Sequence, residues 1–489
     1  MAEVRLASAR DYRHHRHGGA QLRRAWRGVI SVANSASHIG TAGGQEPGLG
    51  LVACTALVVG NMIGSGIFLL PASLARIGPI SLVGWVLTSL GALILALIFG
   101  RLSRLVTKTG GPYAYAETAF GEFMGFLIAW GYWIALWTGN AGVAVALAGY
   151  VGFLFPAVAE STTYSLAVAL ISIWVLTLIN IRGVQEAGFV QIVTTVLKLV
   201  PLVLIGVVGL LWIDGRNFEP VNISNQSNIA AISSAAALTL WAYLGLESAT
   251  VPSGNVRNPE KTIPRATVAG VLIAAIVYIS VTTVAIGVIP SSQLAASSAP
   301  LADVAHMMWG VTGGLLVAIG AVISSFGTLN GFTLLTGQVP YGAAQDRVFP
   351  AVFGELSRFG TPANALILSN FLASVLVTIN FGHGLVDAFN TIVLLAVMSS
   401  LLPYCVCSVA EVAILISRGE LRVRKLLSAT ILGGLGFLYS MWALYGSGAQ
   451  TVFLGFLLLV AGIPVHIAIR WRNARVAAIT TGSQFQKEV

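Results

Sequence analysis

Charged side chains are scarce in this chain of 489 residues: Asp, Glu, Lys and Arg together make up 9%, against about 25% in a soluble globular domain. A chain with so few charges cannot cover a surface that faces water. The same scarcity excludes disorder over most of the chain, because disordered segments combine low hydrophobicity with high charge. Apolar residues reach 56%, so the composition predicts an integral membrane protein with many spans.

Cysteines are also rare, and all three of them (Cys54, Cys405 and Cys407) lie in apolar segments. This placement favours reduced thiols that pack in the core and excludes a disulfide framework. Cys405 and Cys407 are two residues apart and point to different faces of a helix, which makes them a poor metal-binding pair. No HExxH, CxxC or P-loop pattern is present. We therefore expect no metal, no cofactor and no enzymatic activity.

The first 49 residues have little apolar character and many arginines. They contain no apolar core of the kind that a secretory signal needs. We expect residues 1–49 to form a disordered basic tail in the cytoplasm. An organellar presequence is the alternative that the sequence leaves open.

Apolar segments long enough to cross a bilayer recur along the rest of the chain, since a spanning helix needs about 20 mostly apolar residues. The segments at 301–344 and 385–417 are too long for one simple crossing, so we expect them to tilt or to include loop helices. The twelve predicted spans are 51–77, 80–100, 122–154, 164–181, 187–213, 230–254, 266–289, 301–344, 363–381, 385–417, 423–446 and 450–470.

The positive charges are sorted by side. Of the 27 lysines and arginines, 24 lie in the tails and in the loops after even-numbered spans. Only Arg76 and Arg216 lie on the other side, and Lys198 lies inside span five. By the positive-inside rule both termini are cytoplasmic. The net charge of +9 therefore reflects topology and does not indicate a nucleic-acid partner. We expect a multi-pass protein of the inner (plasma) membrane.

Two spans carry helix-breaking sequences near their middle. Span one contains Gly60-Asn61-Met62-Ile63-Gly64-Ser65-Gly66, and span six contains Gly245 and the acid Glu247. Glycine and asparagine are poor helix formers, and lipid offers no hydrogen bonds to an interrupted backbone. Close packing through small residues is an alternative explanation for span one. However, interrupted helices at corresponding positions of two halves indicate an inverted-repeat transporter.

Such breaks suit a zwitterionic ligand. A half-helix that begins near Ser65 directs free N–H groups and a positive dipole end at an anion. Free carbonyls on the other side of each break can hold an ammonium group. The two breaks together therefore predict a receptor for an α-amino acid headgroup.

At these residues the sequence resembles the amino acid–polyamine–organocation transporters, and within them the basic amino acid/polyamine antiporters. The resemblance covers about residues 50–472. The motifs that carry it are Gly60-Asn61 with Gly64-Ser65-Gly66-Ile67-Phe68, Gly110-Gly111-Pro112-Tyr113-Ala114-Tyr115, Leu240-Trp241 with Gly245-Leu246-Glu247-Ser248, Asn258-Pro259, and Gly331-Phe332-Thr333.

The resemblance implies an all-α integral membrane fold of twelve transmembrane helices. The first ten form a five-plus-five inverted repeat in which helices one and six are interrupted. On this basis residues 50–418 would be the transport core, 419–472 two further helices, and 473–489 a cytoplasmic tail. The family is often dimeric, so a homodimer is expected, with membrane lipid around it.

The resemblance also implies site residues. The backbone at Ser65 and Gly66 would bind a substrate carboxylate, and the carbonyls of Met62, Trp241 and Leu244 would bind the α-amino group. Ala135, Leu136 and Asn140 would line the side-chain subsite. Tyr132, Trp241 and Phe332 would be aromatic gates. Glu247 would be the protonatable group.

Several of these residues have a simpler interpretation. Trp241 and Tyr132 could be ordinary packing residues, and Asn140 could hydrogen-bond a neighbouring helix. An acid inside the bilayer is costly and normally faces the protein interior or a cavity, which favours a role for Glu247. Asp387 and Glu411 lie nearer span ends, and we interpret them as structural.

Three positions depart from the pattern of arginine/agmatine exchangers. Phe332 stands where a Trp is expected and stacks less strongly on a cation. Leu136 stands where a small residue is expected, so the resemblance does not establish arginine as the substrate. Lys198 replaces an apolar residue and resembles a lysine of proton-coupled permeases. It could bind carbonyls freed at the span-one break and exchange a proton, or it could snorkel to an interface.

The leading hypothesis is an antiporter that exchanges cationic amino acids and amines of the arginine/agmatine, lysine, ornithine or polyamine class by alternating access. The second is a proton-coupled amino acid symporter of broader specificity that uses Lys198. A membrane-embedded enzyme would need a base for Ser65, for which His306 and His466 qualify only by residue type. A non-transporting receptor is a further alternative.

Overall fold

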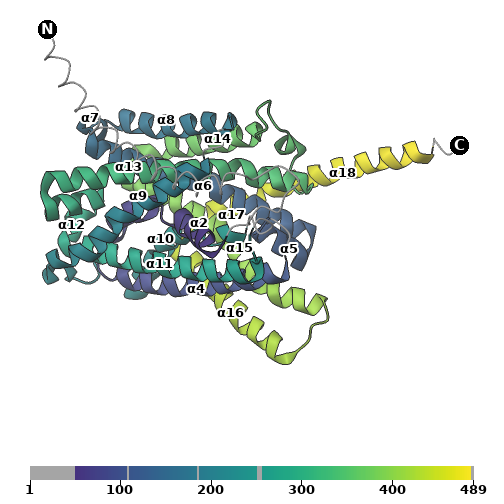
Figure 1. The fold of residues 1–489 in the computed structure, drawn as a ribbon, viewed down its shortest axis with the longest axis horizontal. Helices are drawn as coiled ribbons and strands as arrows, with labels where there is room; N and C mark the ends of the chain where they lie inside the picture. Colours follow the sequence, from purple (N-terminus) through teal and green to yellow (C-terminus); the bar gives the residue numbers. More distant parts are fainter. Residues whose placement is uncertain (1–49, 107–109, 184–186, 251–255, 486–489) are drawn as a thin grey trace, which may run out of the picture.

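The structure, a computed structural model, describes residues 50–106, 110–183, 187–250 and 256–485, and of Ser65, 187–197 and 475–485 it describes the backbone only. The predicted tail at 1–49 lies outside the described residues. In the described ranges the regular elements are all helices (Figure 1). Helices α8 and α14 lie along the top of the view in Figure 1, and α11 and α4 lie towards the bottom, with α16 projecting beyond them.

Ten helical segments of the described chain are apolar and long enough to cross a membrane. An eleventh is the bent pair Leu51–Met62 (α2) and Gly66–Ala75 of α3, with a bend of 41°. The ten segments are Ser81–Leu105 (α4), Glu122–Leu154 (α6), Thr162–Ile181 (α8), Asn228–Thr250 (α10 with η3 and η4), Pro259–Val288 (α11), Pro300–Gln345 (α13), Ala363–His383 (α14 with η7), Leu385–Ser417 (α15), Val423–Gly446 (α16) and Ala449–Ala474 (α17 and the start of α18).

The remaining predicted span coincides with α9, Ala187–Val208. Among the described residues its apolar part is Lys198–Trp212, which is too short for a full crossing. The chain is therefore an all-helical, multi-pass membrane protein, whereas the exact number of twelve crossings stays a prediction.

Short helices connect the spans. On the predicted cytoplasmic side, α5 precedes α6 with its first residue Pro112 preset for a helix start. The short elements are α5 (Pro112–Phe120), α7 (Pro156–Ala159), η1 (Gly209–Trp212), η2 (Gly215–Phe218), α12 (Ser291–Leu294) and η6 (Ala351–Gly354). The last spanning segment is made of α17 (Ala449–Val460) and the start of α18 (Gly462–Phe485).

The longest helix, α13, has 46 residues and is interrupted at Gly310, whose φ of 72° and ψ of −167° are not helical. A positive φ is accessible to glycine without steric cost. The segment before Gly310 is therefore a separate loop helix, and the part after it is the span. This confirms the expectation that 301–344 is more than one simple crossing.

Helix α6 lies at the centre of the bundle, and most of its residues from Gly125 to Gly152 are buried. Small residues let other helices approach it closely: a Cβ atom added to Gly139 would lie 2.8 Å from the ring of Phe332 on α13. Helices α13 and α15 both pack along α6. Helix α3, the second half of the interrupted first span, packs on all three of these helices.

The acids predicted to be structural make ion pairs near helix ends. Arg101 of α4 donates from Nε to Oε1 of Glu411 on α15 at 3.0 Å, and Arg76 pairs with Asp387 at the other end of α15. The three cysteines are buried and free, as their apolar context predicted.

Candidate functional site

The first break separates α2, which ends at Met62, from α3, which spans Ser65–Ala75. Ile63 and Gly64 between them are not helical, with φ and ψ of −77° and 86° at Ile63 and −127° and −147° at Gly64. Gly64 lies directly against α13, because a Cβ atom there would be 2.6 Å from Cγ2 of Thr328. The break therefore lies where the Gly60–Gly66 sequence predicted it. The side chain of Ser65 lies outside the described residues.

The second break follows α10, which ends at Leu240. One 3₁₀ turn, Trp241–Tyr243 (η3), leads to an extended Leu244 with φ of −61° and ψ of 133°. Gly245 then has φ of +98°, and the second 3₁₀ turn Ser248–Thr250 (η4) follows. The conformation at Gly245 is one that other residues rarely adopt, which explains a glycine at this point of an apolar span.

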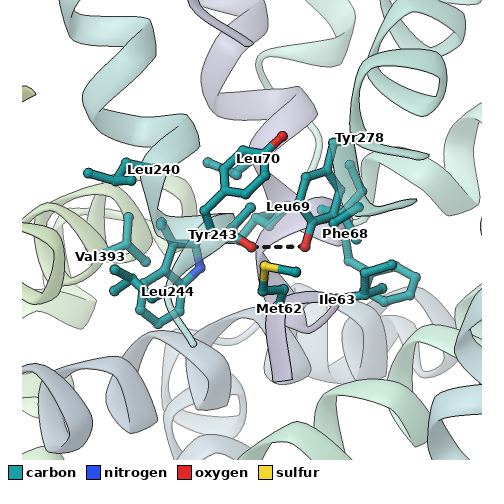
Figure 2. Close-up of a cluster of buried hydrophobic side chains, with 14 of the residues drawn as sticks. Met62, Ile63, Phe68, Leu69, Leu70, Leu240, Tyr243, Leu244, Tyr278 and Val393 are labelled. Atoms are coloured by element: carbon teal, nitrogen blue, oxygen red, sulfur yellow. Dashed lines mark hydrogen bonds between the residues drawn. The ribbon is translucent and has the colours of Figure 1, made fainter. Parts of the chain in front are cut away.

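The two breaks touch each other. A Cβ atom added to Gly66 would lie 3.0 Å from Cδ1 of Trp241 and 3.3 Å from Cα of Ala242, and one added to Gly245 would lie 3.2 Å from Cβ of Asn61. Figure 2 shows Met62 and Ile63 of the first break beside Tyr243 and Leu244 of the second. Glycine at positions 66 and 245 therefore allows the two interrupted backbones to meet in the middle of the bundle.

Glu247 lies just after the second break and is only 1% exposed. Its two carboxylate oxygens each accept a hydrogen bond from a tyrosine on another helix. Tyr132 of α6 donates to Oε1 at 2.8 Å, and Tyr404 of α15 donates to Oε2 at 2.9 Å. Two donors without a competing acceptor suit an anionic carboxylate, so the arrangement can hold a negative charge inside the bundle.

A small cavity lies beside Glu247, with a volume of about 20 Å³. This is room for about one water molecule, so an amino acid or amine can enter only if the surrounding helices or side chains move apart. Glu247 is the only Asp, Glu, Lys, Arg or His side chain on the described wall. The wall is formed by Asn61, Tyr132, Ala135, Leu136, Leu244, Gly245, Glu247, Ser248, Phe332, Leu335 and Ser400.

Six of the predicted site residues line this cavity, and they come from three different segments of the chain. They are Tyr132, Ala135, Leu136, Leu244, Glu247 and Phe332. Met62, Gly66 and Trp241 are not on its described wall. The ring of Trp241 packs on Phe332 with centroids 6.0 Å apart and planes tilted by 40°. Trp241 therefore packs against Phe332 outside the cavity, between the first break and α6.

Asn140 is fully buried, and it too is absent from the described cavity wall. Its Nδ2 donates to Oδ1 of Asn370 on α14 at 2.5 Å and to Oγ1 of Thr333 on α13 at 3.1 Å. In this conformation Asn140 joins three helices, which is the simpler of its two sequence interpretations. A direct contact with substrate stays a prediction.

Lys198 of α9 makes the contact that the sequence suggested. It is 1% exposed, and its Nζ donates to the carbonyl of Gly60 at 2.5 Å. In a continuous helix Gly60 would accept from the N–H of Gly64, but that N–H donates to Met62 instead, at 2.9 Å. The ammonium group of Lys198 therefore satisfies a carbonyl that the break has left without its helical partner.

Several site residues were missed from the sequence. Tyr404 holds Glu247 but is more than 150 positions away from it in the chain, so no local pattern links them. Asn61, Gly245 and Ser248 belong to the motifs quoted above, and their sequence signal was present. Ser400 could have been noticed as one of two adjacent serines in the apolar span α15.

The enzyme alternative gains no support from the described residues. They contain no group of three His, Cys, Asp or Glu side chains placed to hold a metal ion. The ring of His466 packs against Phe126, with centroids 4.7 Å apart, and neither His466 nor His306 lines the cavity.

Comparisons with known proteins agree with the membrane fold. Residues 49–469 match the sequence model of a family described as amino acid permease. Two relatives are each 34% identical to the chain: a putrescine transporter of Haemophilus influenzae, over 85% of this chain and 95% of the relative, and a putative arginine/ornithine antiporter of Bacillus subtilis, over 84% and 95%. A cadaverine/lysine antiporter of Escherichia coli is 36% identical over 73% of this chain and 81% of its own length.

The contact between Gly64 and Thr328 gives a direct test of the first break. Gly64→Ala should lower stability by about 1–3 kcal/mol, because the added methyl group overpacks the interface with α13. Thr328→Ser removes the Cγ2 atom that the methyl group meets, so the double variant should regain much of the loss. The measurement is thermal unfolding of the purified protein in detergent.

Gly434→Ala on α16 is the matched control, since a Cβ atom there would meet nothing within 4 Å. It should leave the melting temperature unchanged or raise it slightly. A Gly64→Ala protein as stable as the control would contradict the close packing at the break.

Proposed function

The chain belongs to the amino acid permease family, and from this premise we propose that it is an antiporter that exchanges cationic amino acids and amines across the membrane by alternating access. Its substrates in this proposal are of the arginine/agmatine, lysine, ornithine or polyamine class. The printed names of the relatives, which include putrescine, cadaverine/lysine and arginine/ornithine, support this class.

The observation that carries the proposal is the position of Glu247. It is a buried carboxylate on the wall of a cavity at the meeting point of two interrupted helices. A single negative charge in an otherwise uncharged site favours a ligand with a positive charge, since an unpaired buried charge is costly. The ammonium group of an amine or a basic amino acid supplies that charge. Phe332 on the same wall adds an aromatic face for a cation.

The headgroup of an amino acid has a separate place in the proposal. Helix α3 begins at Ser65, and the first N–H groups of a helix lack intrahelical partners. They suit a carboxylate, as helix N-termini commonly bind anions. The backbone of Ser65 and Gly66 would take that role, with the carbonyls of Met62, Trp241 and Leu244 around the amino group. Trp241 would act with Tyr132 and Phe332 as a gate.

The small volume of the cavity supports alternating access. At about 20 Å³ the site has no room for substrate in this conformation, so binding must accompany movement of the interrupted spans. We place the substrate between spans one, three, six, eight and ten. The finer architecture belongs to the same proposal: twelve crossings, a five-plus-five inverted repeat over 50–418, two further helices over 419–472, and cytoplasmic termini.

A proton-coupled symporter is the second candidate, and the contact of Lys198 with Gly60 favours it. A buried ammonium group on a freed carbonyl can connect its own protonation to the conformation of the span-one break. Glu247 would be a second proton-binding group. Protons, membrane lipid and a second copy of the chain are the further partners in this proposal.

Transport into proteoliposomes separates the two candidates. The antiporter should take up labelled putrescine, ornithine or arginine only into vesicles loaded with one of these solutes, because each inward step needs an outward one. Empty vesicles should remain empty when a proton gradient is imposed. Uptake into empty vesicles driven by that gradient would contradict exchange and establish symport.

Replacing Glu247 tests the cation site. Glu247→Gln should raise the KM for putrescine about tenfold or more, because a hydrogen bond to a charged group contributes ~1.5–3 kcal/mol and ~1.4 kcal/mol corresponds to a tenfold change. It should also flatten the pH dependence of exchange, since an amide does not take up a proton. Glu420→Gln, at an exposed ion pair with Lys425, is the control. An unchanged KM and pH profile would refute both roles of Glu247.

Replacing Lys198 tests proton coupling. Lys198→Ala should abolish any uptake that an imposed proton gradient drives, while exchange between loaded vesicles continues. Lys261→Ala, which removes a lysine from the predicted cytoplasmic loop, should change neither activity. Full gradient-driven uptake in the Lys198 variant would leave this lysine a structural residue.

A further inference from the structure

The break in span six leaves one particular backbone group without its helical partner. In a continuous α-helix the carbonyl of Ala242 would accept a hydrogen bond from the N–H of Leu246. That N–H donates to the carbonyl of Tyr243 instead, at 3.2 Å, and the N–H of Leu244 donates to Trp241, also at 3.2 Å. The local turn therefore does not use the carbonyl of Ala242.

A tyrosine from the next span takes this carbonyl. The hydroxyl of Tyr278 on α11 donates to the oxygen of Ala242 at 2.9 Å (Figure 2). Tyr278 is completely buried. Two rings hold it in place: Trp85 of α4, with centroids 5.1 Å apart, and Tyr243, with centroids 5.4 Å apart and planes at 80°. The hydroxyl group is thus fixed at the point where the helix is interrupted.

The position of Ala242 matters because residues close to it in the chain help to form the site. Trp241 on one side covers Phe332, and Leu244 lies on the cavity wall. The Cα of Ala242 itself lies 3.3 Å from the point where a Cβ atom of Gly66 would be. A shift of this peptide would therefore change the distance between the two breaks, where the proposed substrate headgroup binds.

We propose that Tyr278 is a positioning residue for transport. Its hydroxyl holds the Ala242 carbonyl and thereby fixes the position of the span-six break relative to the span-one break. The proposal rests on the proposed transport function. Tyr278 itself does not line the cavity, so it acts through the backbone of Trp241 and Leu244. A phenylalanine would fill the same packing space, and only the donor explains a tyrosine here.

The test is Tyr278→Phe in the full-length protein, reconstituted into loaded vesicles. KM for external putrescine should rise about three- to tenfold, the range expected for the loss of one net hydrogen bond. The amount of protein in the membrane should be unchanged and kcat should fall less than KM rises. Replacement of Tyr278 by 4-aminophenylalanine, which keeps a donor at the same place, should restore KM to within about twofold of the wild-type value.

Tyr439→Phe is the matched control, because Tyr439 on α16 is also buried and does not line the cavity. It should leave KM unchanged. An unchanged KM in Tyr278→Phe would overturn the proposal, and so would a lower melting temperature without a KM effect. A Tyr278→Phe protein that fails to reach the membrane while the amino variant is normal would assign the hydroxyl to folding and would also overturn it.

The outcome is separable from that of the proposed function. If the wild-type protein carries a neutral amino acid and no cationic one, the substrate class is wrong, and the same KM comparison is made with the neutral solute. That comparison alone then decides the role of Tyr278.

Discussion

The structure depends on one constraint: inside a membrane there is no water to satisfy the backbone of an interrupted helix. Two spans are interrupted where they contact each other, and each break frees a carbonyl group. Lys198 takes the Gly60 carbonyl, and Tyr278 takes that of Ala242. Side chains of neighbouring spans thus stabilise the interrupted backbone.

The second organising feature is the separation of the two embedded charges. Glu247 lies on the cavity wall and is held by two tyrosines, whereas Lys198 lies behind the first break and does not reach the described wall. In the proposed site, Glu247 would present a negative group to the ligand, while the ammonium group of Lys198 is bonded to the backbone. On the proposed function, this division favours cations as substrates.

Local sequence predicted much of this and tertiary structure supplied the rest. The two breaks could be recognised from the glycines at 60, 64, 66 and 245 and the acid at 247, because such residues are unfavourable in an apolar helix unless the helix is broken there. The contact of Lys198 with the first break was one of two sequence interpretations of this lysine, the other being that it snorkels to an interface. Tyr404 and Tyr278 could not be found in this way: a tyrosine in an apolar span looks the same whether or not its hydroxyl meets a carboxylate or a freed carbonyl. For Asn140 the sequence left two roles open, a ligand contact and a hydrogen bond to a neighbouring helix, and only the structure shows that its amide bonds Asn370 and Thr333.

The central claim is that a cationic substrate binds between the two breaks with its ammonium group at Glu247. A structure of the protein in a lipid nanodisc with putrescine or ornithine bound tests this most directly. The account predicts an enlarged cavity between α3, η3 and α6, with a ligand nitrogen within about 3 Å of a Glu247 oxygen. A ligand bound elsewhere, or one in this cavity with no nitrogen near Glu247, would contradict it.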